Sequence, residues 1–132
     1  MIDRIEALVD AIAHLKGSLS NPDSELYQIR NPLGLPSFSR PGKNEIDDQG
    51  RRVFASLLAG LRACTFDCQL KCSGTSRAGI KVDDKLENLL RVYGVESKLS
   101  QDQVIKFLKR ALKNQEISRQ TPLSWFLEKS KS

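Results

Sequence analysis

Apolar residues recur at steps of three and four positions through most of this chain, which is the period of an amphipathic helix. The first such segment covers residues 2–19, and residues 24–30 can form a second, short helix. The following stretch, 31–43, contains three prolines, each of which disfavours the α conformation in the residue before it. We therefore predict an ordered Pro/Gly-rich loop that lies across the bundle. The apolar side chains that would hold it there are Leu33, Leu35 and Phe38.

The longest predicted helix runs from Asn44 to Gly74 in the middle of the chain. Asn44 is a favourable N-cap, and Asp47 and Asp48 would place negative charge at the positive end of the helix dipole. Gly74 would end the helix in the left-handed conformation. The apolar residues at helical spacing that form its predicted buried stripe are Ile46, Val53, Phe54, Leu57, Leu58, Leu61, Cys64, Cys68 and Cys72.

A second apolar stripe lies on the opposite side of the same predicted helix. A helix that is apolar on two sides is usually packed on two sides, either inside its own bundle or against a partner. We therefore predict a protein interface on this side, for a neighbouring helix or subunit. Its members are Ala55, Ala59, Ala63, Phe66 and Leu70.

Three further helices are predicted in the second half of the chain. Residues 83–93 place leucines and Tyr93 inward, and residues 100–113 begin with a capping box formed by Ser100 and Gln103. Leu99 and Val104 occupy the two positions of a hydrophobic staple before and inside this helix. Thr121 and Pro122 open the last short helix, whose Trp125 is interpreted as a partly buried anchor. The chain thus predicts an all-α fold, a compact bundle of about five helices with a long central helix.

The length of 132 residues fits a single helical-bundle domain, 1–132, with one hydrophobic core. No apolar run approaches the roughly 18 residues that span a bilayer, and the N-terminus is acidic where a signal peptide would be basic. We expect a cytoplasmic protein with no membrane partner. Three cysteines at positions 64, 68 and 72 fit a reducing compartment and a structural role in the core.

The chain offers little catalytic chemistry. Its single histidine, His14, lies beside an apolar helix face and is interpreted as a surface or core-edge residue. No histidine pair, no metal-ligand cluster and no nucleophile with a nearby base can be assembled from the sequence. We therefore expect a protein that is not an enzyme and that needs neither a metal nor another cofactor.

The net charge of +5 is concentrated in the second half of the chain. The first 66 residues hold eight Lys or Arg and eight Asp or Glu, whereas residues 67–132 hold 13 and eight. A basic half favours a polyanionic partner, most often nucleic acid, although a solvated basic surface is the simpler alternative. The densest cationic surface is expected on the helix at 100–113, and it consists of Lys106, Lys109, Arg110 and Lys113.

Eight more cations are candidate contacts to a phosphate backbone. Arg77 and Lys81 stand among glycines and hydroxyl side chains, where backbone amides can approach a phosphate. Arg40 and Lys43 lie in the proline-rich loop. The remaining four flank the faces of the central helix, and they are Arg51, Arg52, Arg62 and Lys71.

Two other functions remain open at this point. The helices on either side of Tyr93-Gly94-Val95 resemble a helix-turn-helix, which would make the protein a DNA-binding regulator. The predicted turn is too long for the compact motif, however, and Gln101 and Gln103 stand where base-reading Asn or Arg side chains are usual. The third reading is a helical protein-interaction adaptor whose basic surface is incidental.

A family resemblance is carried by two segments, NPLGLPSFSRPGKNEIDDQGRRVFASLLAGLRAC and SRAGIKVDDKLENLLRVYGV, in an all-helical chain with cations on several helices. They are similar to the C-terminal part of the large subunit of cyanobacterial type I-D CRISPR effector complexes, a region also made as a separate small subunit from an internal start. The resemblance covers most of residues 25–127. It implies a bundle present in several copies that contacts other subunits, guide RNA and target DNA, including the displaced strand.

Overall fold

The computed structural model describes residues 3–36, 45–47, 49–75 and 79–128. These residues contain six helices and one two-stranded hairpin. In chain order they are α1 (Arg4–Lys16), α2 (Glu25–Gln28), β1 (Glu45–Ile46), β2 (Arg52–Val53), α3 (Leu57–Cys72), α4 (Leu86–Val92), α5 (Lys98–Leu112) and α6 (Ser124–Leu127). The predicted all-α bundle is confirmed. None of the helices in these ranges is both long and apolar enough to cross a lipid bilayer.

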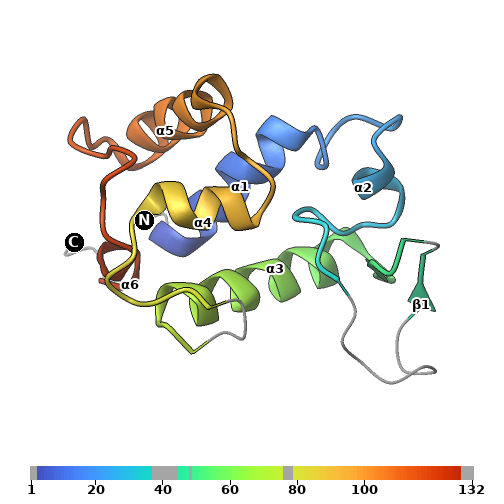
Figure 1. The fold of residues 1–132 in the computed structure, drawn as a ribbon. Helices are drawn as coiled ribbons and strands as arrows, with labels where there is room; N and C mark the ends of the chain where they lie inside the picture. Colours follow the sequence, from blue (N-terminus) through green and yellow to red (C-terminus); the bar gives the residue numbers. More distant parts are fainter. Residues whose placement is uncertain (1–2, 37–44, 48, 76–78, 129–132) are drawn as a thin grey trace.

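Helix α1 lies between α5 and α3 and also packs against α6 (Figure 1). Its start is fixed by Asp3, whose carboxylate accepts hydrogen bonds from the amides of Ile5 and Glu6. Its end is fixed by Gly17, which adopts the left-handed conformation at φ 69°. Leu8 and Ile12 are completely buried between the neighbouring helices. The first predicted helix is therefore confirmed, and it supplies the centre of the core.

The described part of the predicted Pro/Gly-rich loop, residues 31–36, packs against the bundle. The buried hydroxyl of Ser18 donates to the carbonyl oxygens of Ala13 and Pro32, which ties the end of α1 to this segment. Leu33 and Leu35 are each 4% exposed. Phe38, which was expected to join them, lies outside the described residues.

The predicted helix from Asn44 to Gly74 is wrong over the described residues before Leu57, where α3 begins. Glu45–Ile46 and Arg52–Val53 form an antiparallel hairpin in which Glu45 pairs with Val53 and Ile46 with Arg52. Asp47 therefore does not lie at a helix N-terminus, where its charge was expected to stabilise the helix dipole. Its Oδ1 accepts from the amides of Gln49 and Arg51, and Gly50 adopts φ 78°, so the segment turns back on itself. Asn44 and Asp48 lie outside the described residues.

Helix α3 begins at Leu57 because the hydroxyl of Ser56 accepts from the amide of Ala59. It ends as predicted before Gly74, which has φ 76°. The expected buried stripe is correct at its C-terminal half and at Phe54, which is 8% exposed. Three members are wrong. Ile46 lies in β1 and is 42% exposed, Val53 lies in β2 and is half-buried, and Leu58 is 57% exposed. The three cysteines are completely buried, as expected of core residues.

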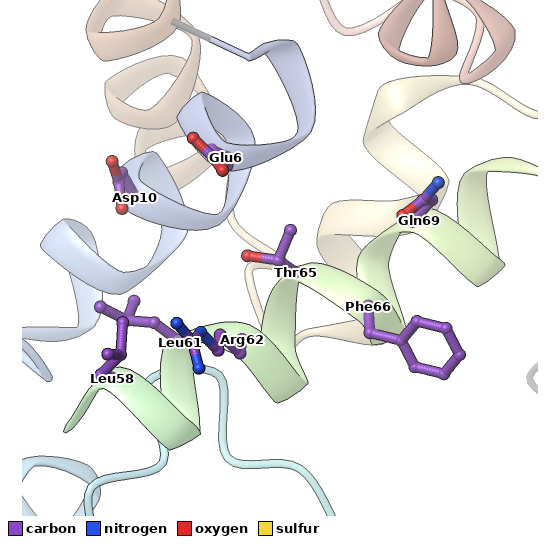
Figure 2. A pocket seen from close by; sticks show the side chains of 8 residues that line it. All are labelled: Glu6, Asp10, Leu58, Leu61, Arg62, Thr65, Phe66 and Gln69. Atoms are coloured by element: carbon purple, nitrogen blue, oxygen red, sulfur yellow. The ribbon is translucent and has the colours of Figure 1, made fainter. Parts of the chain in front are cut away.

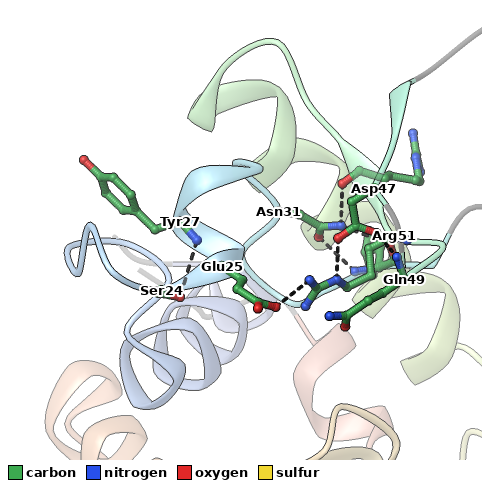
Figure 3. A network of polar contacts seen from close by, with 9 residues as sticks. Ser24, Glu25, Tyr27, Asn31, Asp47, Gln49 and Arg51 are labelled. Atoms are coloured by element: carbon green, nitrogen blue, oxygen red, sulfur yellow. Dashed lines mark hydrogen bonds and ion pairs between the residues drawn. The ribbon is translucent and has the colours of Figure 1, made fainter.

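A buried asparagine joins the loop at 31–36 to the hairpin (Figure 3). The amide nitrogen of Asn31 donates to the carbonyl oxygens of Leu35 and Arg52, and its Oδ1 accepts from the amide of Leu35 at 2.8 Å. Beside it, the Arg51 guanidinium pairs with the carboxylates of Asp47 and Glu25. Partial desolvation raises the pKa of Asp47, but the hydrogen bonds from Arg51 and Gln49 outweigh it, so the pKa is lowered.

The last three helices differ from the prediction mainly at their ends. Helix α4 buries Leu86, Leu89 and Leu90 as expected but begins three residues later than predicted. Helix α5 begins earlier, with Ser97 rather than Ser100 as its N-cap, so the predicted capping box is wrong.

The predicted hydrophobic staple is also wrong, because Leu99 is 72% exposed. Helix α6 starts at Ser124, after the Thr121-Pro122 pair that was expected to open it. Trp125 is half-buried, and the guanidinium carbon of Arg4 lies 4.0 Å from its ring centroid, which confirms that Trp125 is an anchor.

Candidate functional site

The four cations predicted to form the densest basic surface lie together on α5. Lys106, Arg110 and Lys113 are exposed, and Lys109 is half-buried. Successive residues turn by about 100° around a helix, so these four fall within one arc of roughly 100°. None of the ion pairs formed among the described residues involves any of them.

The opposite face of α5 explains why this arc faces solvent. Val104, Ile105 and Leu108 are buried, and α5 packs on α1 through this face. The cations also lie in the last turns of the helix, where positive charge stabilises the negative end of its dipole. Lys113 follows the helix in the left-handed conformation at φ 52° and donates its amide to Lys109. The arc is thus built on a rigid, well-packed element.

An open hollow of about 440 Å³ lies where this arc meets α1. Lys106 and Arg110 line it from α5, together with Gln103 and Phe107. From α1, His14 lines it, and the centroids of the His14 and Phe107 rings are 5.3 Å apart. The sequence prediction missed this pairing because the two residues are far apart in the chain. The only available signal was that each lies at the edge of an apolar helix face.

Two candidate cations near the hairpin are held by other contacts. Arg51 is engaged with Asp47 and Glu25, which neutralise its charge. The guanidinium carbon of Arg52 lies 4.7 Å from the ring centroid of Phe54, and the Nε of Arg52 is buried without a hydrogen-bond partner among the described residues. Neither residue lies on α5, so they do not extend the arc.

Lys71 is a core residue rather than an exposed cation. It is 7% exposed, forms an ion pair with Asp67 and lies 5.0 Å from the ring centroid of Tyr93. The Tyr93 hydroxyl donates to the same carboxylate at 2.6 Å, and burial raises the pKa of Tyr93, which keeps that proton in place. Lys71 also lines the groove beside Phe66, but its charge is already paired with Asp67, which makes it a weaker candidate for a phosphate contact than the cations of α5.

Arg62 faces an acidic neighbourhood (Figure 2). It lines a hollow of about 470 Å³ between α3 and α1, to which α1 contributes Glu6 and Asp10. Burial raises the pKa of Asp10. Two carboxylates and one guanidinium line this hollow, which makes it unfavourable for a phosphate.

The remaining candidates are loop residues. Lys81 is exposed, and its amide donates to the carboxylate of Asp84. Arg40, Lys43 and Arg77 lie outside the described residues. Nine of the twelve predicted contacts lie among the described residues, and four of them form the arc on α5. Arg51, Arg52 and Lys71 line one groove beside α3. Arg62 and Lys81 lie apart from both groups.

The predicted protein interface follows one side of α3. Ala59, Ala63 and Leu70 are half-buried, Ala55 is exposed just before the helix, and Phe66 is 63% exposed. Ala63, Phe66 and Leu70 line a groove of about 1080 Å³ that is bounded on its other sides by the 33–36 segment and the end of α4. Most of its lining is apolar, but charged side chains line it as well, and they are Lys16, Arg51, Arg52, Asp67 and Lys71. An exposed phenylalanine beside an apolar groove is typical of a surface that a partner covers.

The buried cysteines have little nucleophilic character. Burial raises the pKa of the Cys64 thiol to about 12. The pKa of the Cys68 thiol is also raised, mainly by its hydrogen bond with Cys72 and then by its burial. Within the described ranges, no three His, Cys, Asp or Glu side chains come together in a way that could hold a metal ion.

The connection between α4 and α5 and the exposure of two glutamines can be compared with the helix-turn-helix interpretation. The connection between the two helices, residues 93–97, is shorter than predicted, because α5 starts at Lys98. Gln101, however, is 2% exposed and donates to the carbonyl of Val95. It is therefore unable to read bases. Of the two glutamines named as readers, only Gln103 is exposed.

No protein-family model, no curated protein sequence and no solved structure matches the chain. The resemblance seen in residues 25–127 stays a prediction.

Proposed function

We propose that this protein is a non-catalytic nucleic-acid-binding subunit of a CRISPR RNA-guided interference complex. In this proposal it holds guide RNA, target DNA and the displaced strand through their backbones and contacts other subunits and further copies of itself. The arc on α5 is the observation that supports nucleic-acid binding. Its residues Lys106, Arg110 and Lys113 are exposed and take part in no ion pair among the described residues. The CRISPR part is supported by the sequence resemblance.

Backbone binding fits the chemistry of this surface. Lysine and arginine contact phosphates whatever the sequence, whereas base reading needs side chains that reach the edges of bases in a groove. In an RNA-guided complex, pairing with the guide supplies the sequence specificity, so the protein needs only backbone contacts and shape. The groove beside Phe66, whose lining is mostly apolar, supplies a separate surface on which a protein subunit could pack without covering α5.

Neutralising the arc should weaken nucleic-acid binding. We expect the variant Lys106→Gln/Arg110→Gln/Lys113→Gln to bind a mixed-sequence single-stranded RNA about 10-fold or more weakly at low salt, because each phosphate contact releases a counterion. The slope of log K against log[salt] should become shallower by about 2. Fluorescence anisotropy measures both quantities. Lys109 stays unchanged, because its half-buried stem would add a packing effect.

The matched control is Lys85→Gln/Arg91→Gln/Lys98→Gln, which removes three exposed cations outside the arc and changes net charge equally. We expect it to bind like the wild type. Equal weakening in both variants would show a general charge effect and contradict the assignment to α5.

The two alternative functions give different results in the same assay. A preference of the isolated wild type for one duplex sequence would favour the DNA-binding regulator. Absence of binding, both alone and within a complex isolated from cells, would favour the protein-interaction adaptor.

A further inference from the structure

The hollow between α1 and α5 combines an aromatic pair with cations. His14 and Phe107 lie with ring centroids 5.3 Å apart and planes inclined by 34°. Phe107 is half-buried and packs against the core, which fixes its ring, whereas His14 is exposed and lines the hollow. The imidazole is thus supported on one side by Phe107 and remains accessible to a ligand.

The polar groups around this pair suit a nucleotide. Lys106 and Arg110 are one helical turn apart, roughly 6 Å along the axis of α5, and both line the hollow. Gln103, at the same rim, offers an amide that can both donate and accept hydrogen bonds. No Asp or Glu is among the described residues that line the hollow, in contrast to the hollow between α1 and α3, which Glu6 and Asp10 line.

We infer that this hollow binds one unpaired nucleobase, stacked on His14, while Lys106 and Arg110 hold the phosphates on either side of it. Proteins that bind single strands use this combination of an aromatic platform and a cationic track, because every base has a face that can stack. A base inside a duplex is already stacked and paired, so the site selects single-stranded nucleic acid. This site rests on the proposed function, and it specifies that α5 recognises single-stranded rather than double-stranded nucleic acid.

Binding at this site has two separable contributions, which are phosphate contacts to Lys106 and Arg110 and stacking of a base on His14. The phosphate contacts act on any strand, with or without bases, whereas stacking on His14 requires a base. A strand that lacks bases at its central positions therefore retains the first contribution and loses the second.

The test compares a mixed-sequence single-stranded DNA with the same strand carrying abasic sites at its centre. By fluorescence anisotropy, the wild type should bind the base-bearing strand about 5-fold or more tightly than the abasic one, the lower end of the effect of losing one stacking contact. His14→Ala should abolish this difference and His14→Phe should retain it. Circular dichroism should show the same helicity in all three proteins.

Three results would overturn the inference, and the last of them is distinguishable from the first two. Equal affinity of the wild type for both strands, or an unchanged difference in His14→Ala, would remove the stacking site and leave backbone binding by α5 intact. Failure of the wild type to bind either strand would overturn the proposed function together with the inference.

Discussion

Replacing Gly60 with alanine is expected to lower the free energy of unfolding by about 3 kcal/mol or more. Gly60 is buried in α3, where an added Cβ would lie 1.9 Å from the carbonyl oxygen of Arg30 and 3.2 Å from Cδ of Pro32. Alanine is the better helix former by about 1 kcal/mol, but this gain cannot offset a clash with backbone atoms. Either α3 or the segment at 30–32 must move. Urea unfolding followed by circular dichroism measures the loss.

Gly50→Ala is the matched control for this prediction. Gly50 has φ 78°, so alanine there is strained, but nothing lies within 4 Å of the added Cβ. Strain of this kind costs about 1–2 kcal/mol. If Gly60→Ala were as stable as the wild type, the close approach of α3 to Arg30 would be contradicted.

Replacing Asn31 with alanine is the second large effect that we expect. Asn31 is completely buried, and its side chain satisfies the amide and carbonyl of Leu35 and the carbonyl of Arg52. Alanine would remove the acceptor of the Leu35 amide and the side-chain donor to the Arg52 carbonyl, at about 1–3 kcal/mol for each group that is left buried and unpaired. The Leu35 carbonyl would still accept from the amide of Arg52. The expected loss is therefore about 3 kcal/mol in the free energy of unfolding, measured by urea denaturation.

Asn21→Ala provides the comparison, since the exposed Asn21 makes a similar local bond to the amide of Asp23. Water replaces that bond, so its loss should cost less than about 1 kcal/mol. Equal effects of the two substitutions would show that the loop at 31–36 is not held to the hairpin by Asn31.

Much of the fold could be predicted from the sequence because most helices have a clear apolar period and recognisable end residues. Helix α1 followed its pattern to Gly17, and the leucines of α4 were correctly placed inside. The hairpin could not be found in the same way, because Ile46 and Val53 also fit a helical period. The local signal that outweighs this period is Asp47 followed by Gly50, which together make a tight turn.

Errors at helix starts came from a choice between nearby caps. Ser97 and Ser100 are both favourable N-cap residues, and the structure selects Ser97. Leu99 then lies about 140° around the helix from Val104, so the two residues cannot meet in a hydrophobic staple. Leu99 is accordingly exposed, whereas Val104 is buried.

The candidate site was predictable only where it lies within one helix. The arc of Lys106, Lys109, Arg110 and Lys113 follows from the period of α5 alone. Lys71 shows the limit of this reasoning, because its partners Asp67 and Tyr93 bury a residue that the sequence suggested was exposed. The aromatic pair of His14 and Phe107 depends on the packing of α5 on α1, which no local pattern encodes.

The most direct test of the central claim is lysine footprinting of the intact chain with and without a mixed-sequence single-stranded RNA. Acetylation at each lysine, measured by mass spectrometry, reports which ammonium groups the RNA covers. We predict that Lys106 and Lys113 lose most of their reactivity in the presence of RNA, while Lys85 and Lys98, which are also exposed, keep theirs. Protection of Lys85 and Lys98 with none at Lys106 and Lys113 would contradict the assignment of nucleic-acid binding to α5.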